Sequence, residues 1–369
     1  MSKTFVPKDD RPAPISTVGF IGWLRSNLFN SPANSVLTIV VGLALLYYIP
    51  PIFDWAIFSA TLNAETSAEC KQDTGACWAY IKVWWNYFMY LRYPDDQQWR
   101  IDSMYIIAIL AGVPLLLPQV PRKVKMILGV FLLVPFPVIC FFMFTGGSFG
   151  LEPVESNLWG GMFLTLVIAI TGIVASLPLG VVLALGRRSK MPAVRSVCVV
   201  FIEFWRGIPL ITVLFMSSVM LPLFLPEGVT FDKLLRALIG VALFSSAYMA
   251  EVVRGGLQAI PKGQYEAASA LGLSFWKSMA FIILPQALKI VIPGIVNTFI
   301  GLFKDTTLVL IIGMFDLLGS VQSSFTNPDW KDHPHEGYVF AAFAFWIFCF
   351  GMSRYSVALE KKLHTGHKR

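Results

Sequence analysis

The run GGMFLTLVIAITGIVASLPLGVVLAL, Gly160–Leu185, contains no charged side chain. It is longer than the about 20 apolar residues that a helix needs to cross a bilayer core. The rest of the chain has the same character: 56% of its 369 residues are hydrophobic and 14% are charged, where a soluble domain carries roughly 25% charged residues. This composition excludes a soluble globule, a disordered chain and a disulfide scaffold, and it predicts a polytopic membrane protein.

Apolar runs along the whole chain predict the number of membrane spans. Backbone groups in lipid must be hydrogen-bonded internally, and the runs do not alternate as barrel strands do. The expected fold is therefore an all-α polytopic membrane protein with about eight transmembrane helices. The predicted spans are residues 35–51, 102–117, 126–144, 160–185, 197–225, 234–253, 287–314 and 339–357.

The basic residues predict the orientation of these spans. Nineteen of the 29 Lys and Arg residues fall on the side that holds both termini. Because cytoplasmic loops are enriched in Lys and Arg, both termini are expected in the cytoplasm. The net charge of +7 is then explained by membrane topology, and no nucleic-acid partner is predicted.

Two cysteines lie close together in a polar outer loop. Cys70 and Cys77 are seven residues apart, with Gly75 between them. An oxidising compartment favours a disulfide between them, and two unpaired surface thiols are the equal alternative. No other Cys or His lies near, so no metal site is predicted.

One inner loop is longer than a helix connection needs to be. It reads RGGLQAIPKGQYEAASALGLSFWK over Arg254–Lys277. Pro261 suits a helix start and Gly272 a helix stop, so a short helix is expected outside the spans. Its alanines form a small-residue surface that another protein can approach closely, with Glu266 as one charged anchor. The alternative is an interfacial helix bound to lipid.

The spacing in this loop resembles the EAA motif of ABC importer permeases. Glu266, Ala267 and Ala268 are followed after three residues by Gly272, and then by Ile282-x-Leu284-Pro285. In that family the short helix is the coupling helix, which sits in a cleft of the ATPase subunit. The resemblance implies that Glu266, Ala267, Ala268, Gly272 and Pro285 form the ATPase-coupling region of this chain.

Three further motifs narrow the family. Glu203-Phe-Trp-Arg206-Gly207-Ile-Pro209-Leu resembles E-x-x-R-G-x-P-L of the polar amino acid (histidine/glutamine/arginine) permeases. The stretch from Ala247 to Gly256 resembles their A-Y-x-A-E-x-x-R-G-G motif, and Lys304 to Leu308 resembles K-D-[ST]-[ST]-L. The eight-span layout is similar to that of the general L-amino-acid permease subunits.

This resemblance implies a domain organisation. A type I ABC importer core of five helices would occupy residues 158–360 and contain the EAA coupling loop, residues 256–285. A three-helix extension with a long periplasmic loop would precede it at residues 35–157. Cytoplasmic tails would lie at residues 1–34 and 361–369.

The resemblance also implies the function and the partners. The chain would be a permease subunit of an importer for L-amino acids in the bacterial inner membrane, moving substrate by alternating access. It would work with two ATPase subunits, a second and non-identical permease subunit, and a periplasmic amino-acid-binding protein. The chain contains no P-loop motif, so it is expected to be non-catalytic and to bind no cofactor, with ATP and Mg held by the ATPase.

Ionisable residues within the spans are candidates for the substrate pathway or for structural pairs. Glu203 and Arg206 are three residues apart, as are Glu251 and Arg254, so each pair shares one helix face and is expected to pair. For Glu203 and Arg206, bracing of two helices and a gate are the alternatives.

The span that carries this first pair is expected to break. Gly207 and Pro209 weaken the helix in mid-span, and broken helices often expose backbone groups to a substrate. Arg206, Gly207 and Pro209 are therefore pathway candidates.

A second group of pathway candidates lies in the seventh span. Asp305 is placed to bind the ammonium of an amino acid, or alternatively to form a salt bridge between helices. The family resemblance adds the segment from Asn297, and Thr298 lies on the same helix face as Asp305. Some relatives with cationic substrates have Glu where this chain has Thr298, which favours neutral or broad specificity, or a binding role for the second subunit.

Two other classes of protein remain as alternatives. A stand-alone secondary amino-acid transporter would show inverted repeats and would need no docking loop. A membrane scaffold would need neither Asp305 within a span nor a broken fifth span. The sequence favours the importer subunit over both.

Overall fold

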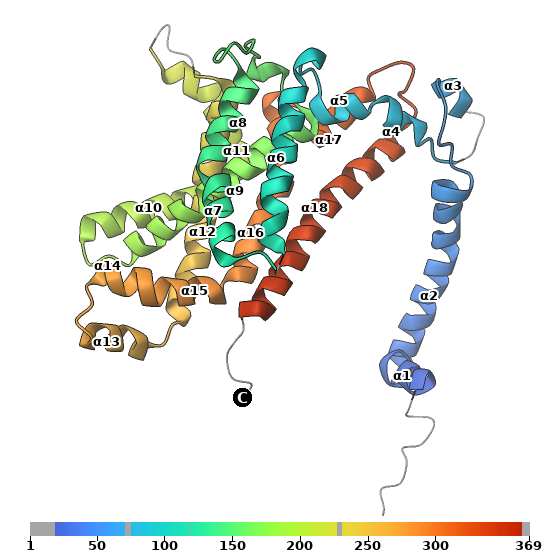
Figure 1. Ribbon diagram of the computed structural model, residues 1–369. Helices are drawn as coiled ribbons and strands as arrows, with labels where there is room; N and C mark the ends of the chain where they lie inside the picture. The colour runs from blue at the N-terminus through green and yellow to red at the C-terminus, as the bar shows by residue number, and fades with distance from the viewer. Residues whose placement is uncertain (1–18, 71–74, 118, 227–230, 364–369) are drawn as a thin grey trace, which may run out of the picture. The chain divides into compact units, whose positions relative to one another are not determined.

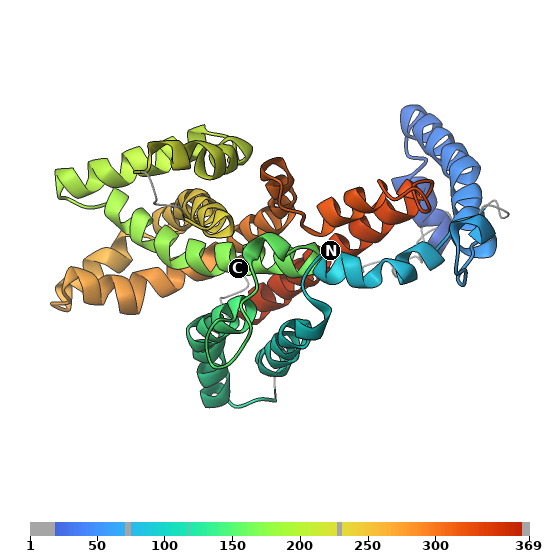
Figure 2. The same cartoon turned by 90° about the horizontal axis from the view of Figure 1, so that it is seen from above.

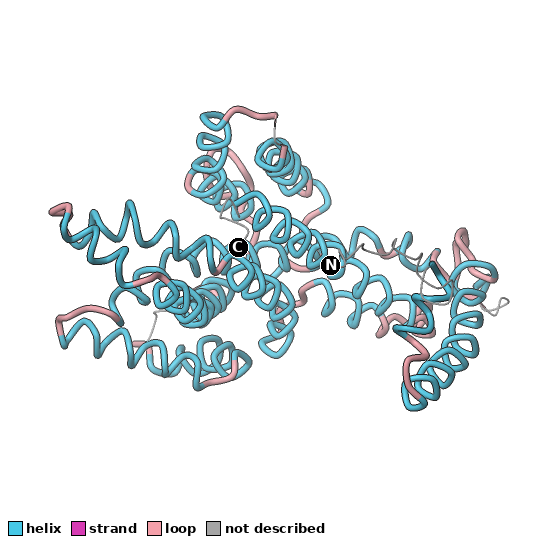
Figure 3. Tube along the Cα trace, turned by 90° about the horizontal axis from the view of Figure 1, so that it is seen from below, coloured by secondary structure: helices cyan, strands magenta, loops and turns pink. Residues whose placement is uncertain are grey.

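A computed structural model of the chain describes residues 19–70, 75–117, 119–226 and 231–363. The first 18 residues of the expected N-terminal tail and residues 364–369 of the expected C-terminal tail lie outside the described residues. Within the described residues the elements are helices, and no strand is formed beyond isolated bridges. Figure 3 shows these helices joined mostly by short loops.

The chain forms two compact units, Met1–Ala79 and Tyr80–Arg369. The first unit contains one long apolar helix, which Ser31 caps by accepting a hydrogen bond from the Asn34 amide at 3.2 Å. None of the residues of this helix is buried within the structure. The elements of the first unit are α1 (Gly19–Asn27), α2 (Pro32–Phe53), η2 (Asp54–Phe58) and α3 (Ser67–Cys70).

The second unit contains the remaining helices (Figure 1). Its first half consists of α4 (Ala79–Val83, which begins at the unit boundary), α5 (Trp85–Tyr90), η3 (Asp95–Gln97), α6 (Trp99–Leu116), α7 (Arg122–Leu133), α8 (Pro135–Thr145), η4 (Ser156–Leu158), α9 (Gly161–Arg187), α10 (Pro192–Gly207), α11 (Leu210–Phe215), η5 (Met216–Met220) and η6 (Leu221–Phe224). Its second half consists of α12 (Lys233–Ala259), α13 (Lys262–Ala270), α14 (Phe275–Ser278), η7 (Met279–Ile283), α15 (Leu284–Ile290), α16 (Ile292–Asp305), η8 (Thr306–Ile312), α17 (Leu317–Ser324) and α18 (Pro334–Leu363).

Seven described helices are long and apolar enough to cross a membrane, and a bent pair makes up to eight. The seven are Pro32–Phe58, Asp95–Leu116, Arg122–Thr145, Gly161–Arg187, Lys233–Ala259, Ile292–Ile312 and Pro334–Leu363. Each matches one predicted span, which confirms the all-α membrane fold. The described helices give the predicted eight transmembrane spans when the bent pair is counted as one span.

The bent pair is the predicted fifth span. Its two parts, Pro192–Gly207 and Leu210–Phe224, meet at an angle of 101°. Ile208 between them is extended, with φ −114° and ψ 136°. A residue before proline is pushed into this conformation by clashes with the proline ring, so Pro209 explains why the helix ends here.

Two long helices, α9 and α12, form the centre of the second unit. Glycines on α9 allow their close approach: a Cβ atom at Gly180 would lie 2.7 Å from Met249 of α12. Gly172 likewise lies against Val241 of α12 and Leu302 of α16. Helix α12 is about half buried over its apolar stretch, which places it innermost.

Helices α6, α7 and α8 lie together beside this core, as Figure 2 shows. Tyr93, Phe144, Trp159 and Phe163 form an aromatic cluster that joins α8 to α9. The compact unit that begins at Tyr80 therefore includes the second and third spans of the expected extension. The boundary at residue 157 stays a prediction.

The aromatic segment of α4 and α5 packs on one end of the second unit, at α17 and α18. The Tyr80 hydroxyl hydrogen-bonds Ser324, and the Tyr87 and Ser323 hydroxyls lie 2.9 Å apart. Phe88 is fully buried and stacks on Phe340. Helix α13 lies at the opposite end of this unit (Figure 1), which is called the α13 end below.

Candidate functional site

The short helix expected in the long inner loop is present as α13. Pro261 precedes its first residue, as the sequence predicts. At its other end Gly272 has φ +70°, the left-handed conformation that glycine adopts without strain. The amides of Gly272 and Leu273 bond the carbonyls of Ser269 and Ala268 at 2.9 and 3.2 Å, the double pattern of a Schellman cap. Sequence alone therefore fixes where α13 begins and ends.

The predicted coupling residues do not all face the same way. Glu266, Ala267, Gly272 and Pro285 are exposed, whereas Ala268 is only 1% exposed. Helix α13 packs on η7, and the small Ala268 side chain allows that approach. The Ala268 side chain therefore faces its own chain, and its place in the ATPase-coupling region stays a prediction.

Large apolar side chains remain exposed beside these residues. Leu271 is 75% exposed and Trp276 is 71% exposed. Phe275 and Phe281 are also exposed, at 50% and 76%. Exposed apolar side chains of this kind are available for contact with a protein or with lipid.

Five charged residues form an ion network near the α13 end. Glu251 of α12 lies at its centre, with Arg254, Arg187 and Arg206 at 2.7, 3.0 and 3.5 Å from its carboxylate. Arg187, the last residue of α9, also contacts Glu203 of α10 at 2.8 Å. The network therefore joins the three helices α9, α10 and α12.

The expected pairing of Glu251 with Arg254 is present. The expected pairing of Glu203 with Arg206 was wrong, because each takes its partner from another helix: Arg187 and Glu251 respectively. The network contains three arginines and two carboxylates, of which Glu203 is the second. Sequence reasoning missed Arg187, although its position at the end of a predicted span is a usable signal.

The network also locates the break in the fifth span. Arg206 lies just before the break between Pro192–Gly207 and Leu210–Phe224 and reaches Glu251, which lies in the last third of α12. Gly207 and Pro209 are exposed beside it. A Cβ atom at Gly207 would meet no atom within 4 Å, so open space surrounds this part of the chain.

The pathway candidates on α16 lie apart from the break. Asn297 is exposed, and Thr298 is half-buried and donates its hydroxyl to the Gly294 carbonyl at 2.9 Å. Asp305 is the last residue of α16 and is half-buried. Within the described part of the chain its carboxylate forms no hydrogen bond or ion pair, so it has capacity for a cationic group.

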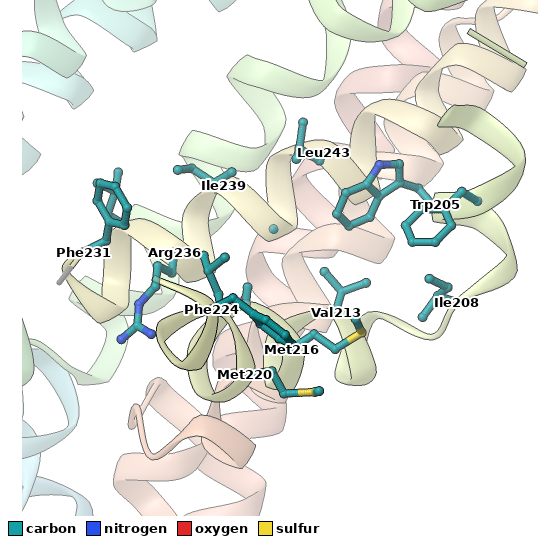
Figure 4. A pocket seen from close by; sticks show the side chains of 15 residues that line it. Trp205, Ile208, Val213, Met216, Met220, Phe224, Phe231, Arg236, Ile239 and Leu243 are labelled. Atoms are coloured by element: carbon teal, nitrogen blue, oxygen red, sulfur yellow. The ribbon is translucent and has the colours of Figure 1, made fainter. Parts of the chain in front are cut away.

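A cavity of about 540 Å³ lies between the α10–η6 segment and α12. Figure 4 shows Trp205, Met216 and Phe224 lining it, and Arg236 is the charged residue among the described residues of its lining. The Arg236 guanidinium already donates to the Ser218 carbonyl at 2.6 Å.

The two cysteines that are expected in an outer loop lie in the first unit. The structure joins Cys70 and Cys77 in a disulfide with a Cα–Cα distance of 5.6 Å. The three remaining cysteines, Cys140, Cys198 and Cys349, are free thiols.

A protein-family model described as "Binding-protein-dependent transport system inner membrane component" matches residues 176–365. This range contains the break, the ion network, α13 and α16. The chain belongs to this family. It is 53% identical to the "Inner membrane amino-acid ABC transporter permease protein YhdY" of Escherichia coli (strain K12), over 99% of both chains.

Other permeases of the family are also similar. The "Glutamate/glutamine/aspartate/asparagine transport system permease protein BztC" of Rhodobacter capsulatus is 42% identical over 97% of both chains. A solved structure described as "Crystal structure of an amino acid ABC transporter with histidines" is 28% identical, covers 55% of this chain and 92% of its own, and has a TM-score of 0.49. The similarity to the first two permeases includes the region before residue 158, so the extension is a feature that they share.

Proposed function

We propose that this chain is a permease subunit of an ATP-driven importer of L-amino acids in the bacterial inner membrane. The observation that carries the proposal is the 53% identity to an amino-acid ABC transporter permease along 99% of both chains. The chain itself would be non-catalytic and would bind no cofactor, with ATP and Mg on separate ATPase subunits. The proposed specificity is for polar amino acids or is broad.

Helix α13 would dock into the ATPase. Glu266 and Ala267 are exposed on it, and Leu271 and Trp276 extend this surface with exposed apolar area. The proposed orientation places the α13 end and both termini in the cytoplasm, since Arg187, Arg188, Lys190, Lys262 and Lys277 gather there. Two ATPase subunits, a second non-identical permease subunit and a periplasmic binding protein would complete the transporter.

Asp305 would receive the substrate ammonium on the pathway. It is half-buried and its carboxylate is unpaired within the described residues, and Thr298 lies on the same helix face two turns away. Four further residues are proposed to line the pathway: Asn297, Arg206, Gly207 and Pro209. Their side chains are exposed in the single chain.

The docking proposal is tested by recovering the tagged chain from its native membrane in mild detergent and measuring the bound P-loop ATPase. Glu266→Lys is expected to lower ATPase recovery about tenfold or more, as a disrupted hot spot does. Glu155→Lys is the matched control, since Glu155 is also exposed and lies far from α13 in the sequence. Equal recovery with both variants would contradict the docking role of α13.

The same recovery separates the importer from a secondary transporter. Co-purification of an ATPase with a second EAA-bearing permease supports the importer, and a chain recovered alone even after cross-linking supports the alternative. For the pathway, Asp305→Asn is expected to reduce uptake about tenfold or more while the complex still assembles, because a desolvated charge contact with the ammonium is lost. Normal uptake would leave Asp305 with a structural role.

A further inference from the structure

The end of α12 leaves one buried carbonyl without its helical partner. In a continuing helix the carbonyl of Leu257 would accept from the amide of residue 261. That residue is Pro261, which has no N–H group. Leu257 is fully buried, and a buried carbonyl without a partner is costly.

Two side chains from other elements supply the missing donors. The Tyr265 hydroxyl of α13 donates to the Leu257 carbonyl at 2.8 Å. The Arg188 guanidinium donates to the same carbonyl at 3.1 Å and to the Tyr265 hydroxyl at 2.9 Å. The three groups form a closed triangle, in which Nη1 of Arg188 donates to both the Leu257 carbonyl and the Tyr265 hydroxyl.

The geometry strengthens this triangle in two further ways. The Arg188 guanidinium carbon lies 5.2 Å from the centroid of the Tyr265 ring, within the range of a cation–π contact. A positive charge at the C-terminal end of α12 is also favoured by the helix dipole. Arg188 directly follows Arg187, so the end of α9 contacts the ion network through Arg187 and α13 through Arg188.

The triangle connects α13 to the two central helices of the unit. Arg188 caps α9, and Leu257 belongs to the last turn of α12. The backbone on either side of α13 transmits its displacement poorly, because Pro261 and the left-handed Gly272 interrupt helical hydrogen bonding there. A second and uncharged contact joins Gln264 of α13 to Gln286 of α15 at 3.2 Å.

We propose that Arg188 and Tyr265 are positioning residues that transmit the displacement of α13 to α9 and α12. This inference rests on the proposed docking of α13 into the ATPase. With the triangle intact, a push on α13 moves the two central helices. Without it, α13 pivots at Pro261 and Gly272 while the bundle stays still, so ATP is hydrolysed with less transport.

The test uses the complete transporter, with its ATPase and binding protein, in proteoliposomes. The measured quantity is the number of amino acids taken up per ATP hydrolysed, because a loss of folding lowers both rates together and leaves their ratio unchanged. Tyr265→Phe removes one oxygen and keeps the ring, and Arg188→Ala removes the guanidinium. Both are expected to lower the ratio by roughly 2- to 30-fold, the range of coupling energies carried by side-chain networks.

Two further variants make the test specific. Lys190→Ala is the matched control, since Lys190 is an exposed cation two residues from Arg188, and its ratio is expected to stay unchanged. Arg188→Lys keeps a cationic donor and is expected to restore part of the ratio. The double variant Arg188→Ala with Tyr265→Phe is expected to be no worse than Arg188→Ala alone, because both changes break one triangle.

An unchanged ratio in both single variants would overturn the proposal. So would loss of ATPase recovery with Arg188→Ala, because Arg188 would then contact the ATPase directly. The docking role fails separately, through normal ATPase recovery with Glu266→Lys.

Discussion

Gly255 and Gly256 offer a direct test of the packing between α12 and α15. They are adjacent in α12, but their surroundings differ. A Cβ atom at Gly256 would lie 2.7 Å from the Ala287 carbonyl oxygen and 2.9 Å from Val291. A Cβ atom at Gly255 would meet nothing within 4 Å. The Gly256 contact is with the backbone of α15, which moves only if the whole helix moves.

The expected magnitudes follow from these distances. Replacing Gly by Ala inside a helix stabilises by about 1 kcal/mol, and this gain is common to both positions. Overpacking adds a cost of about 1–3 kcal/mol at Gly256 alone. Gly255→Ala is therefore expected to raise stability by about 1 kcal/mol, and Gly256→Ala to leave it between unchanged and about 2 kcal/mol lower.

The assay is thermal unfolding of the purified chain in detergent, followed by the fraction that remains monodisperse on size exclusion. A gap of about 1–3 kcal/mol between the variants corresponds to roughly 2–12 °C in Tm for a domain of a few hundred residues. Uptake by the assembled transporter should fall with Gly256→Ala and not with Gly255→Ala. Equal Tm values for the two variants would refute the close approach of α12 and α15.

Three other outcomes follow from the structure. Glu251→Gln leaves three arginines without their shared carboxylate and should lower the free energy of unfolding by about 3 kcal/mol. Glu203→Gln should lower it by about 1 kcal/mol or less, because the Glu203 side chain is 54% exposed. Equal losses of Tm in the two variants would contradict the central place of Glu251. Burial raises the pKa of Asp316 to about 6, so the folded protein favours the protonated carboxyl. The free energy of unfolding should therefore fall by about 3 kcal/mol as the pH rises from about 4 through 6. Asp316→Asn keeps the helix cap and should lack this pH dependence in Tm values measured from pH 4 to 8. A maleimide should label Cys70 and Cys77 only after reduction, measured by mass spectrometry of the peptides that contain them, because Cys140, Cys198 and Cys349 are free thiols. Labelling of Cys70 or Cys77 in the untreated protein would show that the disulfide is absent.

The fold could be predicted from sequence because lipid imposes a strong local rule. Every span needs a long apolar run with its backbone bonded internally, and this requirement is visible in each segment alone. The ends of α13 could be predicted for a similar reason: Pro261 and Gly272 act through their own backbone geometry. The bend at Pro209 belongs to the same class.

Side-chain partners could not be predicted, because they depend on which helices become neighbours. Glu203 and Arg206 share one face of α10, yet Arg187 and Glu251 from other helices lie close enough to replace that pairing. Ala268 shows the same limit, since the motif gives its position but not the direction in which α13 turns its face.

The two arginines at the end of α9 link topology to mechanism. Positive charge at a helix end favours a cytoplasmic location, which is the proposed location of this end of α9. Here adjacent positions point in different directions on the helix, so Arg187 reaches Glu203 and Glu251 while Arg188 reaches Leu257 and Tyr265. Neutralising Arg187 should therefore loosen α10 and α12, and neutralising Arg188 should release α13, although both changes remove the same charge from the same turn.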